Sequence, residues 1–127
     1  MLAYTKTTEG LTVTVQSHFL EERSDVMKRN FFFVYFISIT NHGTTPVRLL
    51  RRHWYIHDSH AADYEVEGDG VVGEQPTIAP GKTYHYNSFC VLKSFEGSMK
   101  GRYTMQREDG STFDADIPTF FLKARLN

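Results

Sequence analysis

Apolar and polar residues alternate along most of the chain, and a period of two is typical of β-strands with one face in the core. Leu11, Val13 and Val15 alternate with threonine and glutamine, which predicts a half-buried strand. Residues 31–37 are apolar at both parities, which predicts a central strand covered on both faces. The polar residues 21–30 between these two segments predict a loop or a short turn.

A second long strand is expected over residues 47–57, and its even-numbered apolar residues should face the core: Leu50, Trp54 and Ile56. Arg48 and Arg52 share this parity, so the strand needs a bulge, an edge position or an ion-pair partner there. Turn residues lie at 41–43 and, as Glu-Asp-Gly, at 108–110. Further strands are expected at residues 63–66, 83–92, 98–106 and 112–117, and after Pro118 a last strand should place Phe120, Leu122 and Ala124 on one face.

This pattern gives roughly seven to nine strands with turn signals at the spacing of an antiparallel β-sandwich. Helical periodicity is hard to find, and there is no linker, internal repeat or low-complexity segment. The 127 residues fit a single domain, residues 1–127. A domain of this length buries roughly two thirds of its unfolded surface, so it needs neither a disulfide nor a structural metal to fold.

Charge and cysteine content narrow the function classes. The net charge of −1 provides no basic field for nucleic acid or for anionic membranes. The single cysteine, Cys90, has no internal disulfide partner, which fits a reducing compartment. Its apolar neighbours predict a buried, inert thiol. The first residues lack the apolar core of a signal peptide, and the longest apolar run is too short to cross a bilayer, so a cytoplasmic protein is expected.

A set of residues spread over essentially the whole chain carries a family resemblance. It comprises Arg52-His53-Trp54, Asp58, the segment GDGVVGEQP at residues 68–76, Pro80-Gly81, Tyr86, Ser88, Gly97, Met99, Gly101, Tyr103, Met105, Phe113, Ile117-Pro118, Phe120 and Leu122. This set resembles the ApaG family, also called CorD. The resemblance implies an immunoglobulin-like or fibronectin-III-like sandwich and a genetic link to cobalt resistance and magnesium efflux. Related domains of eukaryotic proteins are implied to be protein-binding modules, and no reaction is implied.

The segment with Gly68, Gly70 and Gly73 is a literal G-x-G-x-x-G. A dinucleotide site requires this turn between a strand and a helix, and Pro76 and Pro80 leave no room for a helix. The segment therefore predicts a tight loop that links strands, with a pocket for a small anion or a nucleotide, formed by backbone N–H groups, as the alternative. The candidate binding region consists of Gly68, Gly70, Gly73, Glu74, Arg52 and His53.

A cluster of histidines and aspartates follows the second long strand. His53 and His57 would lie on the same side of that strand, about 13 Å apart. A loop could instead bring together a set of donors that suits a divalent transition metal: His57, Asp58, His60 and Asp63. The alternative is a solvated polar turn, and the ApaG resemblance gives His57 and His60 no role.

The remaining chemistry does not predict catalysis. Cys90 has no base beside it in the sequence, there is no G-x-S-x-G or H-E-x-x-H motif, and no carboxylate pair has assignable acid and base roles. Arg51 and Arg52 should face opposite ways on a strand, and Arg52 is expected to pair with Glu65 or Glu74. The core does not hold all of five aromatic residues, which are Phe32, Phe36, Tyr84, Tyr86 and Phe121. Most of them should be core residues or cross-strand pairs, and Phe121 is expected to point outward.

We therefore expect a non-enzymatic module that recognises a protein partner through loops and one exposed sheet face, as a monomer or a homodimer. No cofactor, nucleic acid or membrane is expected. Two alternatives stay open. One is a metal-linked role in cobalt resistance and magnesium efflux, and the other is binding of a nucleoside polyphosphate or phosphate at the glycine loop.

Overall fold

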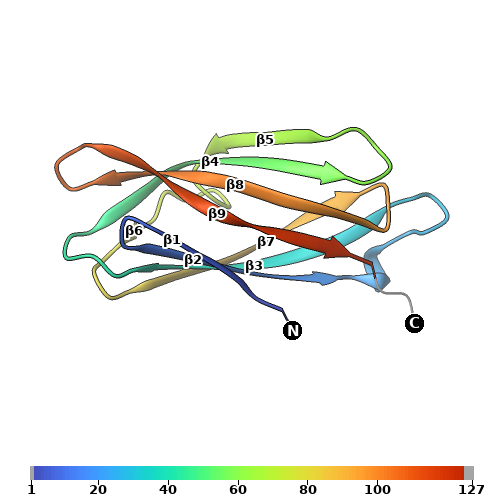
Figure 1. Cartoon of the computed structure of the whole chain (residues 1–127), viewed down its shortest axis with the longest axis horizontal. Coiled ribbons are helices and arrows are strands. Elements are labelled where there is room, and N and C mark those ends of the chain that lie inside the picture. Colours follow the sequence, from blue (N-terminus) through green and yellow to red (C-terminus); the bar gives the residue numbers. More distant parts are fainter. Residues whose placement is uncertain (1, 125–127) are drawn as a thin grey trace.

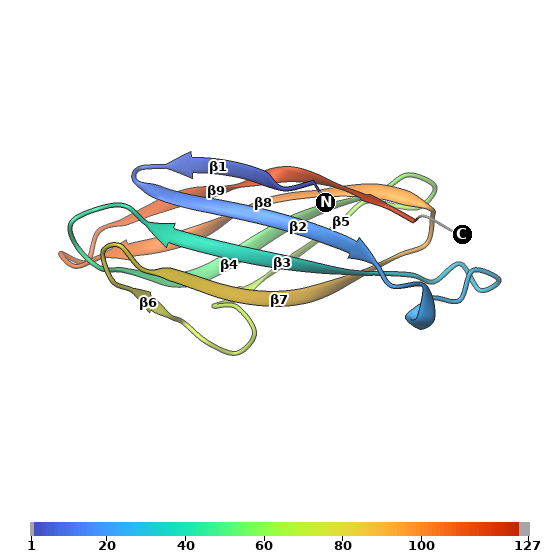
Figure 2. The ribbon, with the colours of Figure 1, turned by 90° about the horizontal axis from the view of Figure 1, so that it is seen from below.

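Two antiparallel sheets pack face to face in the computed structural model, which describes residues 2–124 (Figures 1 and 2). The strands are β1 (Tyr4–Thr8), β2 (Leu11–Phe19), β3 (Phe31–Asn41), β4 (Val47–Asp58), β5 (Tyr64–Asp69), β6 (Thr77–Ile78), β7 (Thr83–Leu92), β8 (Glu96–Arg107) and β9 (Thr112–Lys123). One turn of 3-10 helix, η1 (Glu21–Arg23), lies in the polar segment between β2 and β3. Within residues 2–124, no helix is long and apolar enough to cross a membrane.

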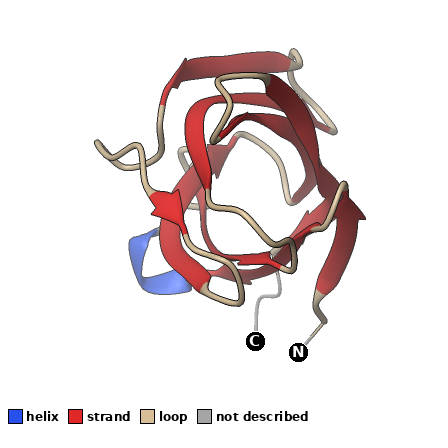
Figure 3. Ribbon diagram, turned by 90° about the vertical axis from the view of Figure 1, so that its left-hand side faces the viewer, coloured by secondary structure: helices blue, strands red, loops and turns tan. Residues whose placement is uncertain are grey.

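The strand order defines the sandwich. One sheet runs β1-β2-β3-β7, and the other runs β5-β4-β8-β9 with the short β6 paired to the start of β4. Consecutive strands β3 and β4 lie in different sheets, and the chain returns to the first sheet with β7 beside β3 before it crosses back to β8. This exchange between two layers is the immunoglobulin-like or fibronectin-III-like arrangement, and the view along the strands shows the layers around the core (Figure 3). The predicted all-β sandwich is confirmed.

The core lies between the sheets, where every second side chain of each strand points inward. In β2, Leu11, Val13 and Val15 are buried, as their alternation predicted. Across the core, the Trp54 ring of β4 lies 5.3 Å from the ring of Tyr35 and 5.9 Å from that of Phe120. Aromatic rings at such separations add to stability beyond the area that they bury.

The outer face of β3 differs from the prediction. Odd-numbered residues from Phe31 to Ile39 are buried, but the even-numbered residues face outward, and Phe36 is 45% exposed. The prediction that both faces of residues 31–37 are covered was wrong, because the sandwich formed by residues 2–124 has two layers and no third layer over this sheet. The short η1 contacts one end of the sheet, where the guanidinium of Arg23 lies 5.6 Å from the centroid of the Phe32 ring. Apolar residues at both parities here reflect an exposed aromatic surface instead of a third layer.

A β-bulge sets which residues of β4 face the core. The register between β4 and β8 shifts between Leu49 and Arg51, so the buried parity changes from odd to even along the strand. Of the three alternatives that the sequence left open, the bulge is present, and Trp54 and Ile56 are buried as expected. Leu50, however, is the bulged residue and only partly buried, and Leu49 takes the core position instead.

The C-terminal strand is longer than predicted. The two strands expected before and after Pro118 form one strand, β9, whose register with β8 shifts between Met99 and Gly101. A proline cannot donate a hydrogen bond to the ladder. It is tolerated here because the ladder is already interrupted at this irregularity of a terminal strand. The hairpin that joins β8 to β9 closes as predicted, with Gly110 at a φ of 89°.

Candidate functional site

The glycine-rich segment forms a tight hairpin turn. The N–H of Val71 donates to the carbonyl of Glu74 at 2.8 Å, and the N–H of Glu74 donates back to the carbonyl of Val71 at 2.9 Å. The two central residues, Val72 and Gly73, both have positive φ angles of 48° and 79°, which is the pattern of a type I′ turn. No helix follows the turn, so the structural reading as a tight loop is confirmed and the geometry of a dinucleotide site is absent from this segment.

Gly70 in this segment is required by close packing. Its φ is 60°, and a Cβ at this position would overlap the carbonyl oxygen of Glu74. The backbone here passes too close to itself for any side chain, and this explains one glycine of the motif without a ligand.

The side chain of Arg52 holds the glycine segment in place through hydrogen bonds to its backbone. Its Nη1 donates to the carbonyl oxygens of Asp69 at 2.9 Å and Gly70 at 3.0 Å. The guanidinium leaves little space beside Gly68, where an added Cβ would lie 3.2 Å from Nη1. The expected ion pair of Arg52 with Glu65 or Glu74 is wrong, because Arg52 faces the interior side of the sheet and donates to backbone carbonyls instead.

His53 lies on the opposite face of β4 from Arg52. Its Nε2 lies 2.7 Å from Oε1 of Glu65, its Nδ1 lies 3.2 Å from Oε2 of Glu67, and its ring stacks on Tyr55 at 4.5 Å. Glu74 accepts a hydrogen bond of 2.9 Å from the hydroxyl of Tyr84 on β7. The candidate region of Gly68, Gly70, Gly73, Glu74, Arg52 and His53 is therefore divided between two faces of one sheet and does not form a single site.

The histidine and aspartate loop does not gather its four candidate ligands. Nδ1 of His57 lies 2.7 Å from Oδ1 of Asp63, so these two side chains meet. Asp58 is buried and accepts hydrogen bonds from the N–H of Lys93, at 2.7 Å, and from the hydroxyl of Ser94. His60 is exposed and joins this network only through its backbone N–H, which donates to Ser94.

Asp58 therefore links the end of β4 to the turn after β7. Within residues 2–124, no three His, Cys, Asp or Glu side chains converge as metal ligands would. Of the four residues that a loop could have brought together, the structure brings together the side chains of His57 and Asp63 and directs that of Asp58 to Lys93 and Ser94.

Tyrosines line the interior side of β7, which the strand pattern alone did not indicate. The hydroxyls of Tyr86 and Tyr103 lie 2.5 Å apart, and burial raises the pKa of both phenols. Burial also raises the pKa of Tyr35 on β3, which lies opposite Ser88 of β7. The sequence does place Tyr84, Tyr86 and Ser88 at every second position of the strand. Their hydroxyl groups make them polar, however, and polar residues in a strand are normally assigned to the solvent side.

Cys90 is buried at the end of this row. Its Sγ lies 3.5 Å from the hydroxyl of Tyr64, and burial raises the pKa of the thiol. A protonated thiol beside a phenol that also keeps its proton is a poor nucleophile.

An apolar surface covers the outer side of β3 and β7, and we call it the β3–β7 face: Phe32, Val34, Phe36, Phe89 and Val91. The register places Phe32 opposite Val91 and Val34 opposite Phe89, so these side chains are neighbours. The rings of Phe32 and Phe89 stack at 5.0 Å, and Phe89 is 61% exposed. The prediction of a strand covered on both faces did not anticipate this surface, although Phe32 and Phe36 were among the aromatic residues that did not all fit inside.

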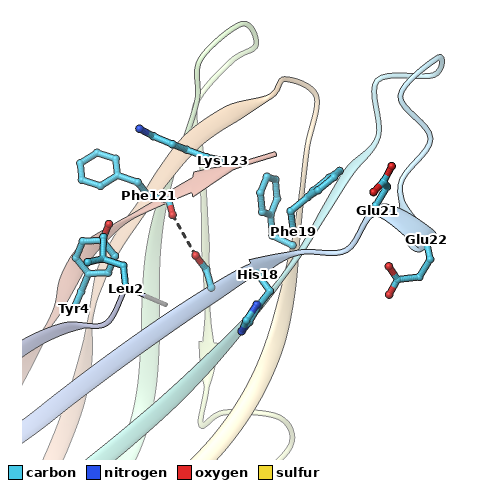
Figure 4. Close-up of a pocket in the computed structure, with 10 residues that line it drawn as sticks. Leu2, Tyr4, His18, Phe19, Glu21, Glu22, Phe121 and Lys123 are labelled. Carbon is cyan, nitrogen blue, oxygen red and sulfur yellow. Dashed lines mark hydrogen bonds between the residues drawn. The ribbon is translucent and has the colours of Figure 1, made fainter. Parts of the chain in front are cut away.

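A hollow of about 850 Å³ lies at the end of the sandwich between β2 and β9 (Figure 4). Phe121 forms one wall, is 52% exposed and packs edge-on against Tyr4 at 6.2 Å, so its predicted outward position is confirmed. The hydroxyl of Ser17 donates to the carbonyl of Phe121 at 3.2 Å. Glu21 and Glu22 stand at one rim of the hollow and Lys123 at the other.

Comparison with known proteins agrees with the sandwich and its sequence. The family model described as the ApaG domain matches residues 21–107. A protein named ApaG from Anaeromyxobacter dehalogenans is 49% identical over 116 residues, which is 91% of each chain. A second protein named ApaG, from Methylobacterium radiotolerans, is 46% identical over 119 residues, or 94% of this chain and 92% of the relative.

A crystal structure of a Bordetella pertussis protein described as ApaA is similar in three dimensions. Its TM-score is 0.87 at 40% sequence identity, and the match covers 90% of this chain and 93% of that one. Fold and surface thus define an immunoglobulin-like sandwich with an exposed aromatic sheet face. Within that class, the chain belongs to the ApaG family.

Proposed function

We propose that this chain is a protein-binding module without catalytic activity of its own, and that the β3–β7 face is its recognition surface. The observation that carries the proposal is a row of neighbouring apolar side chains on the outer sheet face, of which Phe36, Phe89 and Val91 are exposed and Phe32 and Val34 are partly buried. Contiguous exposed apolar surface on a soluble domain marks a site of interaction. Aromatic residues are enriched at protein interfaces, since each ring buries a large area.

The surroundings of this face have the anatomy of an interface. Toward one end of the sheet, the apolar residues give way to polar pairs, in which Ser38 bonds to His85 at 2.9 Å and Thr40 bonds to Thr83 at 2.8 Å. An apolar centre beside a polar rim is the usual composition of a specific interface. The strands that carry these side chains are paired along their length, so the surface is held rigid before a partner binds.

Two charged residues of the candidate regions are engaged in structural bonds. Asp58 is buried against Lys93 and Ser94, and Arg52 donates to backbone carbonyls. Burial keeps the Cys90 thiol protonated by raising its pKa. The glycine turn and the histidine loop add no observation in favour of nucleotide binding or of a metal-linked role.

Affinity capture from extracts of the source cell tests the proposal. The native chain is compared with a double variant of the face, Phe32→Ser with Phe36→Ser. A matched control, Phe95→Ser with Phe121→Ser, removes two exposed phenylalanines elsewhere on the surface. Proteins captured by the native chain and by the control, but lost with the face variant, are the expected result. Loss with the control and retention with the face variant would place recognition elsewhere.

A further inference from the structure

The strand β7 ends its sheet, and one of its two backbone edges has no strand paired to it among residues 2–124. The N–H of Asn41 donates to the carbonyl of Lys82 at 3.0 Å, in line with the register that places Ile39 opposite Tyr84. In an antiparallel pair, hydrogen-bonded residues alternate along each strand. The even-numbered residues of β7 therefore bond to β3, and the odd-numbered residues direct their N–H and C=O groups toward the free edge.

Two other contacts agree with this assignment. On the far side of β3, the N–H of Leu20 donates to the carbonyl of Phe32 at 2.8 Å, so even-numbered residues of β3 bond to β2 and odd-numbered ones bond to β7. The hydroxyl of Tyr64 reaches the carbonyl of Val91 at 3.4 Å, which is open only if Val91 faces the free edge. The outward set is Thr83, His85, Asn87, Phe89 and Val91.

The other terminal strands carry protecting residues or cover one another, whereas β7 carries none and is approached at its edge by the Tyr64 hydroxyl, which donates to the carbonyl of Val91. Strand β1 carries Lys6, which pairs with Asp116 of β9 at 3.2 Å, so these two edges cover one another. Strand β9 also contains a proline, and β5 carries three carboxylates, at Glu65, Glu67 and Asp69. Strand β7, with the sequence TYHYNSFCVL, has no lysine, arginine, carboxylate or proline. Charges and prolines are the usual means by which terminal strands avoid pairing with another chain.

We infer that β7 pairs antiparallel with β7 of a second copy about a two-fold axis, which joins the two sheets that contain β3 into one continuous sheet. A second copy fits this edge because antiparallel alignment of an uncharged strand with itself creates no like-charge pair. The net charge of −1 leaves little long-range repulsion between copies. A two-fold axis also closes the assembly at two chains, since each edge is used once.

The pairing places two β3–β7 faces side by side. Phe89 and Val91 lie on the outer side of the paired strand, so the apolar surface continues across the axis. The dimer does not depend on which protein the face recognises, and its test is separate from the capture experiment.

Sedimentation equilibrium of the full chain, from about 1 to 500 µM, measures the association. Asn87→Pro removes an outward N–H near the middle of the strand, and every register that pairs three or more outward residues of each copy uses this N–H. A proline whose N–H would face solvent is tolerated on a terminal strand, so the monomer keeps its own ladder. Asn87→Ala removes the same side chain and retains the N–H, and is the matched control.

We expect dimer for the native chain and for Asn87→Ala, and monomer over the same range for Asn87→Pro. A native chain that is monomeric throughout overturns the inference. A dimer that persists in Asn87→Pro, or that is lost equally in Asn87→Ala, also overturns it. If Asn87→Pro does not fold, the association of Phe89→Lys is compared with that of Phe95→Lys as its matched control. Only Phe89→Lys places like charges near the proposed axis, so only this variant should be monomeric.

Discussion

Two tyrosine hydroxyls inside this sandwich are paired by a hydrogen bond. Tyr103 is fully buried, and its hydroxyl meets that of Tyr86 at 2.5 Å. Every buried side-chain polar atom of the described residues has a partner of this kind. Loss of one partner therefore leaves the other buried and unpaired, which costs more than the bond itself contributes.

Tyr86→Phe is expected to lower the free energy of unfolding by about 1–3 kcal/mol, because the hydroxyl of Tyr103 loses its partner. Urea denaturation followed by fluorescence measures this change. Tyr84→Phe is the matched control on the same strand, since its hydroxyl bonds to the exposed Glu74 and the loss leaves no buried group unpaired. Equal stability of native chain and Tyr86→Phe would show that the Tyr86–Tyr103 bond contributes nothing.

At the scale of elements, strand parity decides what each residue does. The alternation in β2 and the hairpin at residues 108–110 were predictable, because local pattern and turn chemistry are sufficient there. The faces of β3 were not, since the number of layers is a property of the whole fold. Parity also places Arg52 and His53 on opposite faces of β4. The bulge that sets the parity of this strand was expected only as one of three alternatives.

The glycines of β8 explain part of the family resemblance at this scale. A Cβ on Gly97 would overlap the carbonyl oxygen of His57, and one on Gly101 would overlap that of His53. Both contacts are with the backbone of β4, which cannot move without breaking its own ladder. The close approach of β4 and β8 therefore requires glycine at these positions.

Gly101→Ala is expected to lower the free energy of unfolding by about 1–3 kcal/mol through overpacking against β4. Thermal or urea unfolding checks this. Ser98→Ala, on the same strand and without such a contact, should change stability by less than about 0.5 kcal/mol. A Gly101→Ala variant as stable as the Ser98→Ala variant would contradict the account of the β4–β8 contact.

At the scale of the whole molecule, buried phenols link stability to pH. Burial raises the pKa of Tyr35, Tyr86 and Tyr103, so the folded chain keeps these protons at pH values where the unfolded chain loses them. Stability from these groups is fully present below the tyrosine pKa of the unfolded chain, about 10, and is lost as pH rises through the folded values.

The free energy of unfolding is therefore expected to fall as pH rises above about 10, with the buried Cys90 thiol acting in the same direction from about pH 9. Urea titrations at a series of pH values measure the slope. The slope should be shallower in Tyr86→Phe, which has one buried phenol fewer. A free energy that stays constant or rises up to about pH 11 would contradict the role of the buried tyrosines.

The central claim is that the β3–β7 face recognises a protein, and the dissociation constant of a captured partner tests it most directly. Isothermal titration with the native chain, with Phe32→Ser plus Phe36→Ser, and with Phe95→Ser plus Phe121→Ser gives three values. We predict that the face variant binds at least about tenfold more weakly, a loss of about 1.4 kcal/mol, while the control binds within about twofold of the native chain. Equal affinity of the native chain and the face variant would contradict the claim.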